Sequence, residues 1–194
     1  MRILYRQTLQ CPLRPHAEQT LVFKELEARY GDVDGGLFPK YLIPILHVMG
    51  DVKGKTILDL GCGSKRSAES SSFFGSGWEP WGCRALQLLG ADVIGVDIAS
   101  NKDETFRWIE ADLTQPTSLQ EIADQSVDLA YESMLFDSPI FEDVCYKHAR
   151  QTNTPGFREL VEKRIVSQLE RILKPEGIFL HNNPLQADRD AFWR

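Results

Sequence analysis

Lys55-Thr-Ile-Leu-Asp-Leu-Gly-Cys-Gly63 is the stretch that decides the fold of this chain. Residues 55–60 form a short and mainly apolar run, which predicts a buried strand. Gly61, Cys62 and Gly63 follow it directly. Glycines at this place let the backbone turn sharply, and they let a ligand come closer than a Cβ atom would allow. The stretch therefore predicts a strand that ends in a ligand-binding turn.

Further short runs that are mostly apolar on both faces follow at residues 92–97, 106–110, 127–132 and 177–182. This pattern is typical of strands buried between two layers of helices. Helical patterns lie between the runs at 79–89 and at 157–173, and glycine or proline follows each of them. The alternation predicts an α/β fold over residues 51–194: a three-layer α/β/α, Rossmann-like sheet of parallel strands joined by crossover helices.

The first 50 residues carry a different pattern. Residues 16–30 and Leu37–Met49 hold apolar side chains near helical spacing, and Pro44 is expected to kink or interrupt the second helix. We interpret residues 1–50 as an N-terminal helical cap. Residues 64–77 form a serine-rich loop at a place where a connection is usually about 2–6 residues long. We interpret this loop as a lid over the ligand site, with a partly disordered loop as the alternative.

Composition and charge exclude several classes of function. The 194 residues carry a net charge of −6, which argues against broad binding to nucleic acid. The four cysteines have no C-x-x-C spacing, so neither a metal site nor a disulfide framework is predicted, and reduced thiols fit a cytoplasmic protein. The sequence shows neither a signal peptide nor an uncharged apolar run of about 20 residues, so it predicts a soluble protein that does not cross a membrane.

Three acidic residues stand near the ends of predicted strands. Asp59 lies in the opening strand beside the glycine turn, Asp97 ends the second strand, and Asp112 follows the third. The carboxyl ends of adjacent parallel strands meet at the edge of the sheet where open α/β proteins bind ligands. Asp97 can accept hydrogen bonds from both hydroxyls of a ribose, and Asp112 from an exocyclic amine, although Asp112 is also placed to cap a helix starting near Pro116. The pattern predicts an adenosine-type cofactor.

The turn favours one adenosine cofactor over the others. A dinucleotide site needs G-x-G-x-x-G, because the pyrophosphate rests on bare backbone amides at a helix N-terminus. The sequence after Gly61 lacks the third glycine, and no tyrosine begins the Tyr-x-x-x-Lys pattern of short-chain oxidoreductases. A phosphate-free ligand with a positive sulfonium fits an acidic site better than a pyrophosphate does. The predicted cofactor is therefore S-adenosylmethionine, and a nicotinamide oxidoreductase is disfavoured.

Five motifs, in the family's order, resemble those of the class I S-adenosylmethionine-dependent methyltransferases. Residues 55–63 resemble the first motif, 92–98 the second and 109–113 the third. Residues 127–131 are similar to the strand-four motif, and 171–178 to the leucine, proline and glycine that lead into the fifth strand. Five motifs in order are far more specific than any one of them alone.

The resemblance implies where the cofactor binds. In this family the first motif's backbone and acid hold the methionine end, the second motif's acid holds the ribose, and the third motif's acid faces the adenine amine. Here the acids in these roles are Asp59, Asp97 and Asp112. The full set predicted to bind the cofactor is Asp59, Gly61, Cys62, Gly63, Asp97, Ile98, Asp112, Leu113 and Tyr131.

The predicted function is transfer of a methyl group from S-adenosylmethionine to an acceptor that the sequence leaves unidentified. The acidic charge favours a small molecule or a protein as the acceptor. The alternative is a non-catalytic member of the same fold that binds the cofactor or a partner. No catalytic residue is assigned: Glu132 is interpreted either as a general base or amine-binding group, or as a surface or capping carboxylate. His148 and His181 are interpreted as structural.

Two departures from the family pattern stand out. Lys65 occupies the place of the usual third glycine. The family's sheet usually continues into a sixth and a seventh strand, whereas here about a dozen residues follow the fifth. We expect a sheet that is shortened at its C-terminal end, with a chain that lacks a C-terminal portion as the alternative. The edge of a shortened sheet needs a cover. We expect that cover from the N-terminal helices or from a partner chain, which makes a homodimer a candidate assembly.

Overall fold

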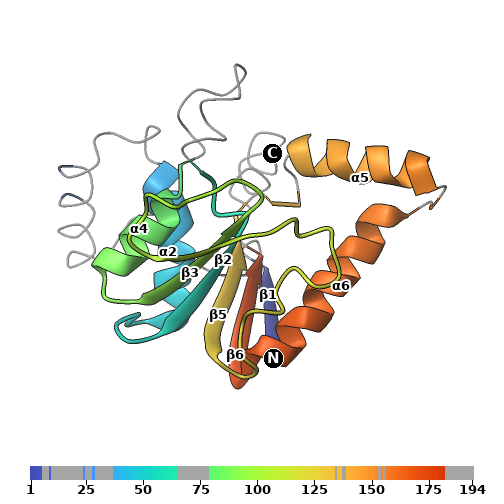
Figure 1. Cartoon of the computed structure of the whole chain (residues 1–194). Helices are drawn as coiled ribbons and strands as arrows, with labels where there is room; N and C mark the ends of the chain where they lie inside the picture. Colours follow the sequence, from blue (N-terminus) through green and yellow to red (C-terminus); the bar gives the residue numbers. More distant parts are fainter. Residues whose placement is uncertain are drawn as a thin grey trace, which may run out of the picture.

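The computed structural model describes residues 1–5, 9, 24, 28, 37–64, 79–133, 135–136, 139–152, 154 and 156–181. Within these residues the chain forms a sheet with helices on both faces (Figure 1). The strands are β1 (Arg2–Tyr5), β2 (Thr56–Leu60), β3 (Asp92–Asp97), β4 (Arg107–Glu110), β5 (Val127–Glu132) and β6 (Leu173–His181). The helices are α2 (Leu37–Met49), α4 (Trp81–Leu88), α5 (Pro139–Thr152) and α6 (Phe157–Ile172). The predicted helix at 16–30, apart from Lys24 and Ala28, and the predicted lid, apart from Ser64, lie outside the described residues.

The six strands run in the order β1-β6-β5-β2-β3-β4, and every neighbouring pair is parallel. The α/β prediction and all five predicted strands are confirmed. The order reverses at β2, because β3 and β4 are added on one side of it while β5 and β6 lie on the other. Such a switch point leaves a crevice outside the carboxyl ends of the strands, which is where open α/β sheets bind ligands.

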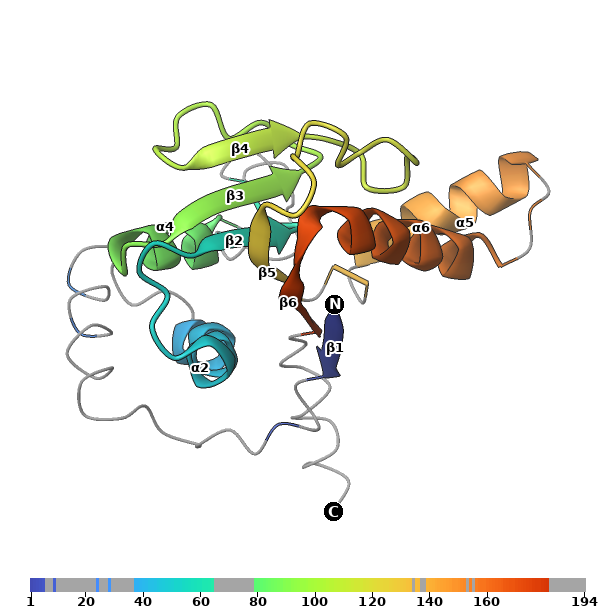
Figure 2. The same cartoon turned by 90° about the horizontal axis from the view of Figure 1, so that it is seen from below.

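Alternate residues of each strand point to opposite faces of the sheet and build two cores. The core on the face of α2 and α4 contains Ile57, Val93 and Leu129, whereas Leu58 and Ile94 pack with α5 and α6 on the other face. Figure 2 shows these layers, with α2 and α4 on one side of the sheet and α6 on the other. The strands are apolar at almost every position because both faces of the sheet are covered.

The helix α2 is part of this layered core. Leu42 and Ile45 are fully buried in the same cluster as Ile57 of the central strand. The helix continues through Pro44, so the expected interruption at that residue is wrong. Proline removes a backbone donor and crowds the carbonyl four residues earlier. Burial of the inner face of α2 stabilises the helix against that local cost.

The edge beyond β6 is covered by the first residues of the chain. β1 pairs in parallel with β6, with Arg2 opposite Ile178 and Tyr5 opposite His181. The sequence analysis assigned this cover to the N-terminal helices or to a partner chain, so that expectation is wrong for this edge. A four-residue strand gives little local signal, and its partner lies at the opposite end of the described chain.

The helix α6 confirms the clearest helical pattern in the sequence, and it also holds the loop that follows β4. Val161, Ile165 and Leu169 are fully buried along one face. The guanidinium of Arg171 donates to the carbonyl oxygens of Leu119 and Ile122, both at 2.8 Å. Residues 111–126 are held in turns, and the helix considered near Pro116 is not formed.

Candidate functional site

The glycine turn lies at the carboxyl end of β2, beside the switch point. Gly61 has φ +73° and Gly63 has φ +83°, a left-handed conformation that residues with a side chain rarely adopt. A Cβ atom on Gly61 would also lie 3.0 Å from Cδ1 of Leu135. Both glycines are therefore required by the path of the backbone, as the sequence predicted.

The backbone amides of this turn donate hydrogen bonds inside the protein. The N–H groups of Gly61 and Cys62 donate to the carbonyl oxygen of Val96, at 2.8 and 3.1 Å. The N–H of Gly63 donates to Oδ2 of Asp97 at 2.9 Å. A pyrophosphate site needs such amides to point at the ligand. These three amides are instead used to join the turn to β3.

Two polar side chains that the sequence analysis did not single out hold the turn in place. The side-chain amide of Asn101 donates to the carbonyl oxygen of Gly63 at 2.9 Å, and Asn101 is itself buried. The hydroxyl of Ser64 donates to the carbonyl oxygen of Ser100 at 3.0 Å. Their partners lie 36 to 38 residues away along the chain, so no short motif indicates them.

Asp97 stands at the end of β3 with acceptor capacity left over. Its Oδ2 accepts from Gly63, and its Oδ1 accepts from the N–H of Ala99 at 2.9 Å. A carboxylate has about four acceptor sites in all, so acceptor capacity remains for a diol. Burial raises the pKa of Asp97, while hydrogen bonds from the backbone amides of Ala99, Gly63 and Ile98 oppose that shift.

The predicted cofactor-binding residues Ile98, Asp112 and Leu113 follow β3 and β4 at the same edge of the sheet. Ile98 follows Asp97 and is 57% exposed, which gives the edge an apolar surface. Oδ1 of Asp112 accepts from the N–H and the hydroxyl of Thr114, at 2.9 and 2.7 Å, and Oδ2 accepts from Gln115 at 3.1 Å. Partial burial raises the pKa of Asp112, but these hydrogen bonds outweigh it and the net shift is downward. Asp112 thus stabilises its own turn, while Leu113 packs into the core.

Asp59 lies beneath the turn in a buried polar cluster. Its Oδ2 accepts a hydrogen bond from the hydroxyl of Tyr131 on β5 at 2.5 Å and another from the thiol of Cys83 on α4 at 3.4 Å. Asp59 is 4% exposed and Tyr131 is 1% exposed. Burial raises the pKa of Asp59 to about 7, although the hydrogen bond from Tyr131 lowers it. The cluster joins β2, β5 and α4 directly under the proposed ligand site.

Cys62 is a buried residue of the turn. Its thiol lies 3.4 Å from the carbonyl oxygen of Gly63. A hydrogen bond with Cys83 lowers the pKa of Cys62, but burial and the neighbouring carboxylates outweigh it and raise that pKa overall. A protonated thiol is a poor nucleophile. We therefore interpret Cys62 as a packing residue of the turn and not as a nucleophile.

Glu132 and His181 meet at the carboxyl ends of β5 and β6. The two residues are opposite each other in the strand register, and Nδ1 of His181 lies 3.2 Å from Oε1 of Glu132. The sequence analysis considered each residue alone and did not predict the pair, because 49 residues separate them along the chain. A carboxylate and an imidazole together can bind a donor and move a proton.

The comparison with solved structures supports the fold seen here. The crystal structure of the PH0226 protein from Pyrococcus horikoshii is similar with a TM-score of 0.50, at 16% sequence identity, over 86% of this chain and 62% of that chain. The chain has a Rossmann-like fold. It spans less than two thirds of the length of the PH0226 protein.

Two further solved structures are each similar to this chain with a TM-score of 0.42, at 15% sequence identity over 89% of its residues. One is a proposed S-adenosyl-L-methionine-dependent methyltransferase from Methanococcus maripaludis, of which 67% is covered. The other is the 1,6-didemethyltoxoflavin-N1-methyltransferase of Burkholderia thailandensis, of which 66% is covered. No family model and no curated protein matches the sequence.

The described residues contain neither a group of potential metal ligands nor a helix that could span a membrane. No three His, Cys, Asp or Glu side chains in this part of the chain come together in a way that would hold a metal ion. None of the helices in the described ranges has the length and the apolar run that crossing a membrane requires.

Proposed function

We propose that this chain binds S-adenosylmethionine at the turn after β2 and transfers its methyl group to an acceptor. The observation that carries the proposal is the use of the turn's backbone amides. The N–H groups of Gly61, Cys62 and Gly63 all donate within the protein, which disfavours a pyrophosphate. S-adenosylmethionine has no phosphate, and its sulfonium charge suits a site with Asp59 and Asp97 close by.

The predicted residues lie at three strand ends, and each strand end is assigned to a different part of the cofactor. We assign Asp97 to the ribose, since its carboxylate retains acceptor sites beside the turn. Ile98 offers the exposed apolar surface that a purine ring needs, and Asp112 is assigned to the adenine amine. The Gly61–Gly63 backbone is assigned to the methionine end. Asp59 and Tyr131 support this backbone from below.

The chemistry asked of the protein is alignment and exclusion of water. The bound cofactor supplies a methyl group that is already activated on a positively charged sulfur. An in-line displacement then requires a fixed geometry between the acceptor and that methyl carbon, and this is where the protein lowers the barrier. The buried hydrogen-bond network of Asn101, Ser64 and Asp97 keeps the turn rigid for this purpose.

Isothermal titration with S-adenosylhomocysteine tests the cofactor. We expect saturable binding with one ligand per chain, whereas the dinucleotide NAD should produce no heat of binding at the same concentrations. A sample whose folding is confirmed by circular dichroism, and which takes up no S-adenosylhomocysteine at high micromolar concentration, contradicts the proposal.

Asp97→Ala should weaken binding of S-adenosylhomocysteine by more than about tenfold, because a charge-assisted pair of hydrogen bonds to the ribose is lost. Asp97→Asn removes the charge with little change of shape, so it should weaken binding as well. The matched control is Asp92→Ala, which removes an exposed carboxylate at the opposite end of the same strand. An unchanged affinity in both Asp97 variants removes this residue from the ribose role.

The acceptor and the compartment are part of the proposal. The acidic charge of the chain supports a small molecule or a protein as acceptor over nucleic acid. We also propose a cytoplasmic location. It is supported by the thiols of Cys62 and Cys83, which share a hydrogen bond and not a disulfide, as is usual where thiols are kept reduced.

The alternative function is a non-catalytic protein of the same fold that binds the cofactor or a partner, and Lys65 in place of the third glycine favours it. Incubation with a methyl-labelled donor and a panel of amines, alcohols, thiols and proteins distinguishes the two functions. A labelled product supports the enzyme. Cofactor binding without product from any acceptor supports the non-catalytic protein.

A further inference from the structure

Glu132 has a buried oxygen that accepts no hydrogen bond from the residues that the structure describes. Its side chain is 3% exposed, and Oε1 faces Nδ1 of His181 at 3.2 Å. Oε2 is buried and has no hydrogen-bond partner within this part of the chain. A buried carboxylate oxygen normally has a donor, because losing water without a replacement is costly. This oxygen therefore has the capacity for a donor supplied by a ligand.

Aromatic rings lie against the His181 side of the pair. The ring of His181 lies 4.5 Å from that of Phe179 and 5.6 Å from that of Phe136, measured between centroids. Phe136 in turn makes an edge-to-face contact with Phe141 of α5, at 5.5 Å. A carboxylate among aromatic rings is well suited to an organic cation, since the ring faces also attract positive charge.

The pair lies on the far side of β2 from the proposed adenosine site. Asp97 ends β3 and Asp112 follows β4, whereas Glu132 and His181 end β5 and β6 on the other side of the central strand. Glu132 is opposite Leu60, the residue directly before the glycine turn. The turn to which we assign the methionine end thus lies between the adenosine residues and this pair, which places the pair on the acceptor side of the proposed cofactor.

We propose that Glu132 binds the methyl acceptor, and that this acceptor is an amine which arrives as an ammonium ion. The inference rests on the proposed function. An ionised carboxylate only accepts hydrogen bonds, so its ligand must donate. A hydroxyl also donates, but it brings no positive charge to a site where Glu132 and Asp59 are close enough to repel each other. An ammonium supplies both the donor and the charge.

The same pair supplies the proton acceptor that an amine requires. An ammonium nitrogen has no lone pair, so a proton must leave it before it can react. Glu132 accepts this proton, while His181 holds Oε1 of Glu132 in position. The neutral nitrogen then forms a bond to the methyl carbon of the sulfonium donor, as the carbon–sulfur bond breaks and its electron pair stays on sulfur. The products are a methylated ammonium and S-adenosylhomocysteine, and the proton on Glu132 passes to water. Glu132 is the catalytic residue in this scheme, and His181 is a positioning residue.

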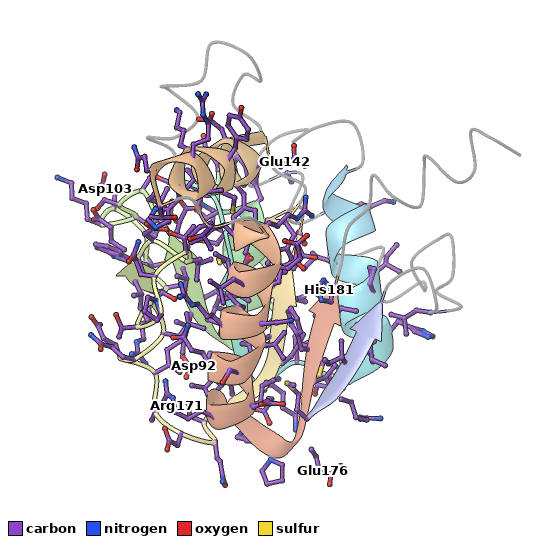
Figure 3. The ribbon with its side chains drawn as sticks, turned by 90° about the vertical axis from the view of Figure 1, so that its right-hand side faces the viewer. Asp92, Asp103, Glu142, Arg171, Glu176 and His181 are labelled. Atoms are coloured by element: carbon purple, nitrogen blue, oxygen red, sulfur yellow. The ribbon has the colours of Figure 1, made fainter. Side chains whose placement is uncertain are left out.

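Benzylammonium and benzyl alcohol test the inference, because they share an aromatic ring and differ in the donor group and its charge. Their binding to protein saturated with S-adenosylhomocysteine is measured by ligand-observed NMR. We expect benzylammonium to bind at least about tenfold more tightly, as a charge-assisted hydrogen bond predicts. Glu132→Gln should abolish this preference and leave the affinity for S-adenosylhomocysteine within about twofold. The matched control is Glu176→Gln, at the opposite end of β6 from His181 (Figure 3), which should change neither.

His181 is tested by the same ratio. His181→Phe keeps an aromatic ring beside Phe136 and Phe179 but removes the group that holds Oε1 of Glu132. We expect a smaller preference for benzylammonium with unchanged affinity for benzyl alcohol, whereas a merely structural role would weaken both probes equally.

The outcomes separate the inference from the proposed function. If S-adenosylhomocysteine does not bind, the proposed function is overturned and the inference with it. If S-adenosylhomocysteine binds but the two probes bind equally, only the inference is overturned. A preference for benzylammonium that survives Glu132→Gln overturns the role of Glu132 in the same way.

Discussion

Asp59→Asn is expected to flatten the pH dependence of the protein's stability between about pH 4 and pH 7, where wild type loses stability as the pH rises. Burial raises the pKa of the Asp59 carboxyl from 3.8 to about 7 in the folded protein. The folded state therefore keeps a proton that the unfolded state releases above about pH 4. The stability linked to this proton is fully present below the unfolded pKa and is lost as the pH passes the folded pKa. The whole loss is about 4 kcal/mol, at about 1.4 kcal/mol per pKa unit.

Urea unfolding at about pH 5 and about pH 8 measures the effect. From the two pKa values, wild type should lose about 3 kcal/mol between these conditions through Asp59, and Asp59→Asn should lose that much less. The side chain of asparagine has nearly the same size and does not titrate. Asp92→Asn, an exposed carboxylate, is the control and should behave as wild type. Equal pH slopes for wild type and Asp59→Asn would show that Asp59 does not carry a raised pKa.

Gly82→Ala is expected to destabilise the protein by about 2–3 kcal/mol, although alanine is the better helix former by about 1 kcal/mol. Gly82 lies in the first turn of α4, and a Cβ atom there would lie 2.7 Å from the hydroxyl oxygen of Tyr131 and 3.3 Å from Oδ2 of Asp59. The first of these distances is too short for any real contact. Tyr131 is buried and cannot move freely, so its hydrogen bond to Asp59 must be disturbed. Above about pH 7, where Asp59 is ionised, this is a hydrogen bond to a charged group, which contributes about 1.5–3 kcal/mol.

Tyr131→Phe provides the control, because it removes only the hydroxyl that the added methyl group of Gly82→Ala would meet. The ring carbon that bears this hydroxyl lies 3.8 Å from the Cβ position, which is an ordinary contact. In the Tyr131→Phe background we expect Gly82→Ala to be close to neutral, because only the contact of 3.3 Å with Oδ2 of Asp59 remains and that side chain is no longer fixed by the Tyr131 hydroxyl. A double-mutant cycle of urea unfolding curves should therefore give a coupling of about 2 kcal/mol or more. A coupling near zero would mean that Gly82 does not make room for the Tyr131–Asp59 hydrogen bond.

Much of the fold was predictable because its signals are local. Each strand of the inner sheet is a short apolar run, since helices cover both of its faces, and α6 carries its buried residues at three- and four-residue spacing. The helix α5 was not predicted. Of its described side chains, Phe141 and Cys145 are the buried ones, and two apolar positions are too few to give a recognisable helical pattern. β1 was not predicted because its four residues find their partner strand at the other end of the sequence.

The site divides in the same way. The positions of Gly61, Gly63 and Asp97 were predictable, since positive φ angles call for glycine and a strand end places a carboxylate at the ligand edge. The sequence did not predict that Asn101, Cys83 and His181 contact residues of the site. Each acts on a residue at least 24 positions away, and a single sequence does not show which distant side chains will meet.

The sequence by itself determined that residues 55–63 form a strand and a glycine turn, because a short apolar run and the conformation of glycine depend only on near neighbours. The tertiary structure alone decided how that turn is used. Parallel pairing brought Val96 and Asp97 beside the turn, where they take up its amides and disfavour a pyrophosphate. It also brought Tyr131 to Asp59 across 72 residues, and His181 to Glu132 across 49. Such contacts form only when strands that lie far apart along the chain become neighbours in the sheet, which is why they appear in the fold and in no motif.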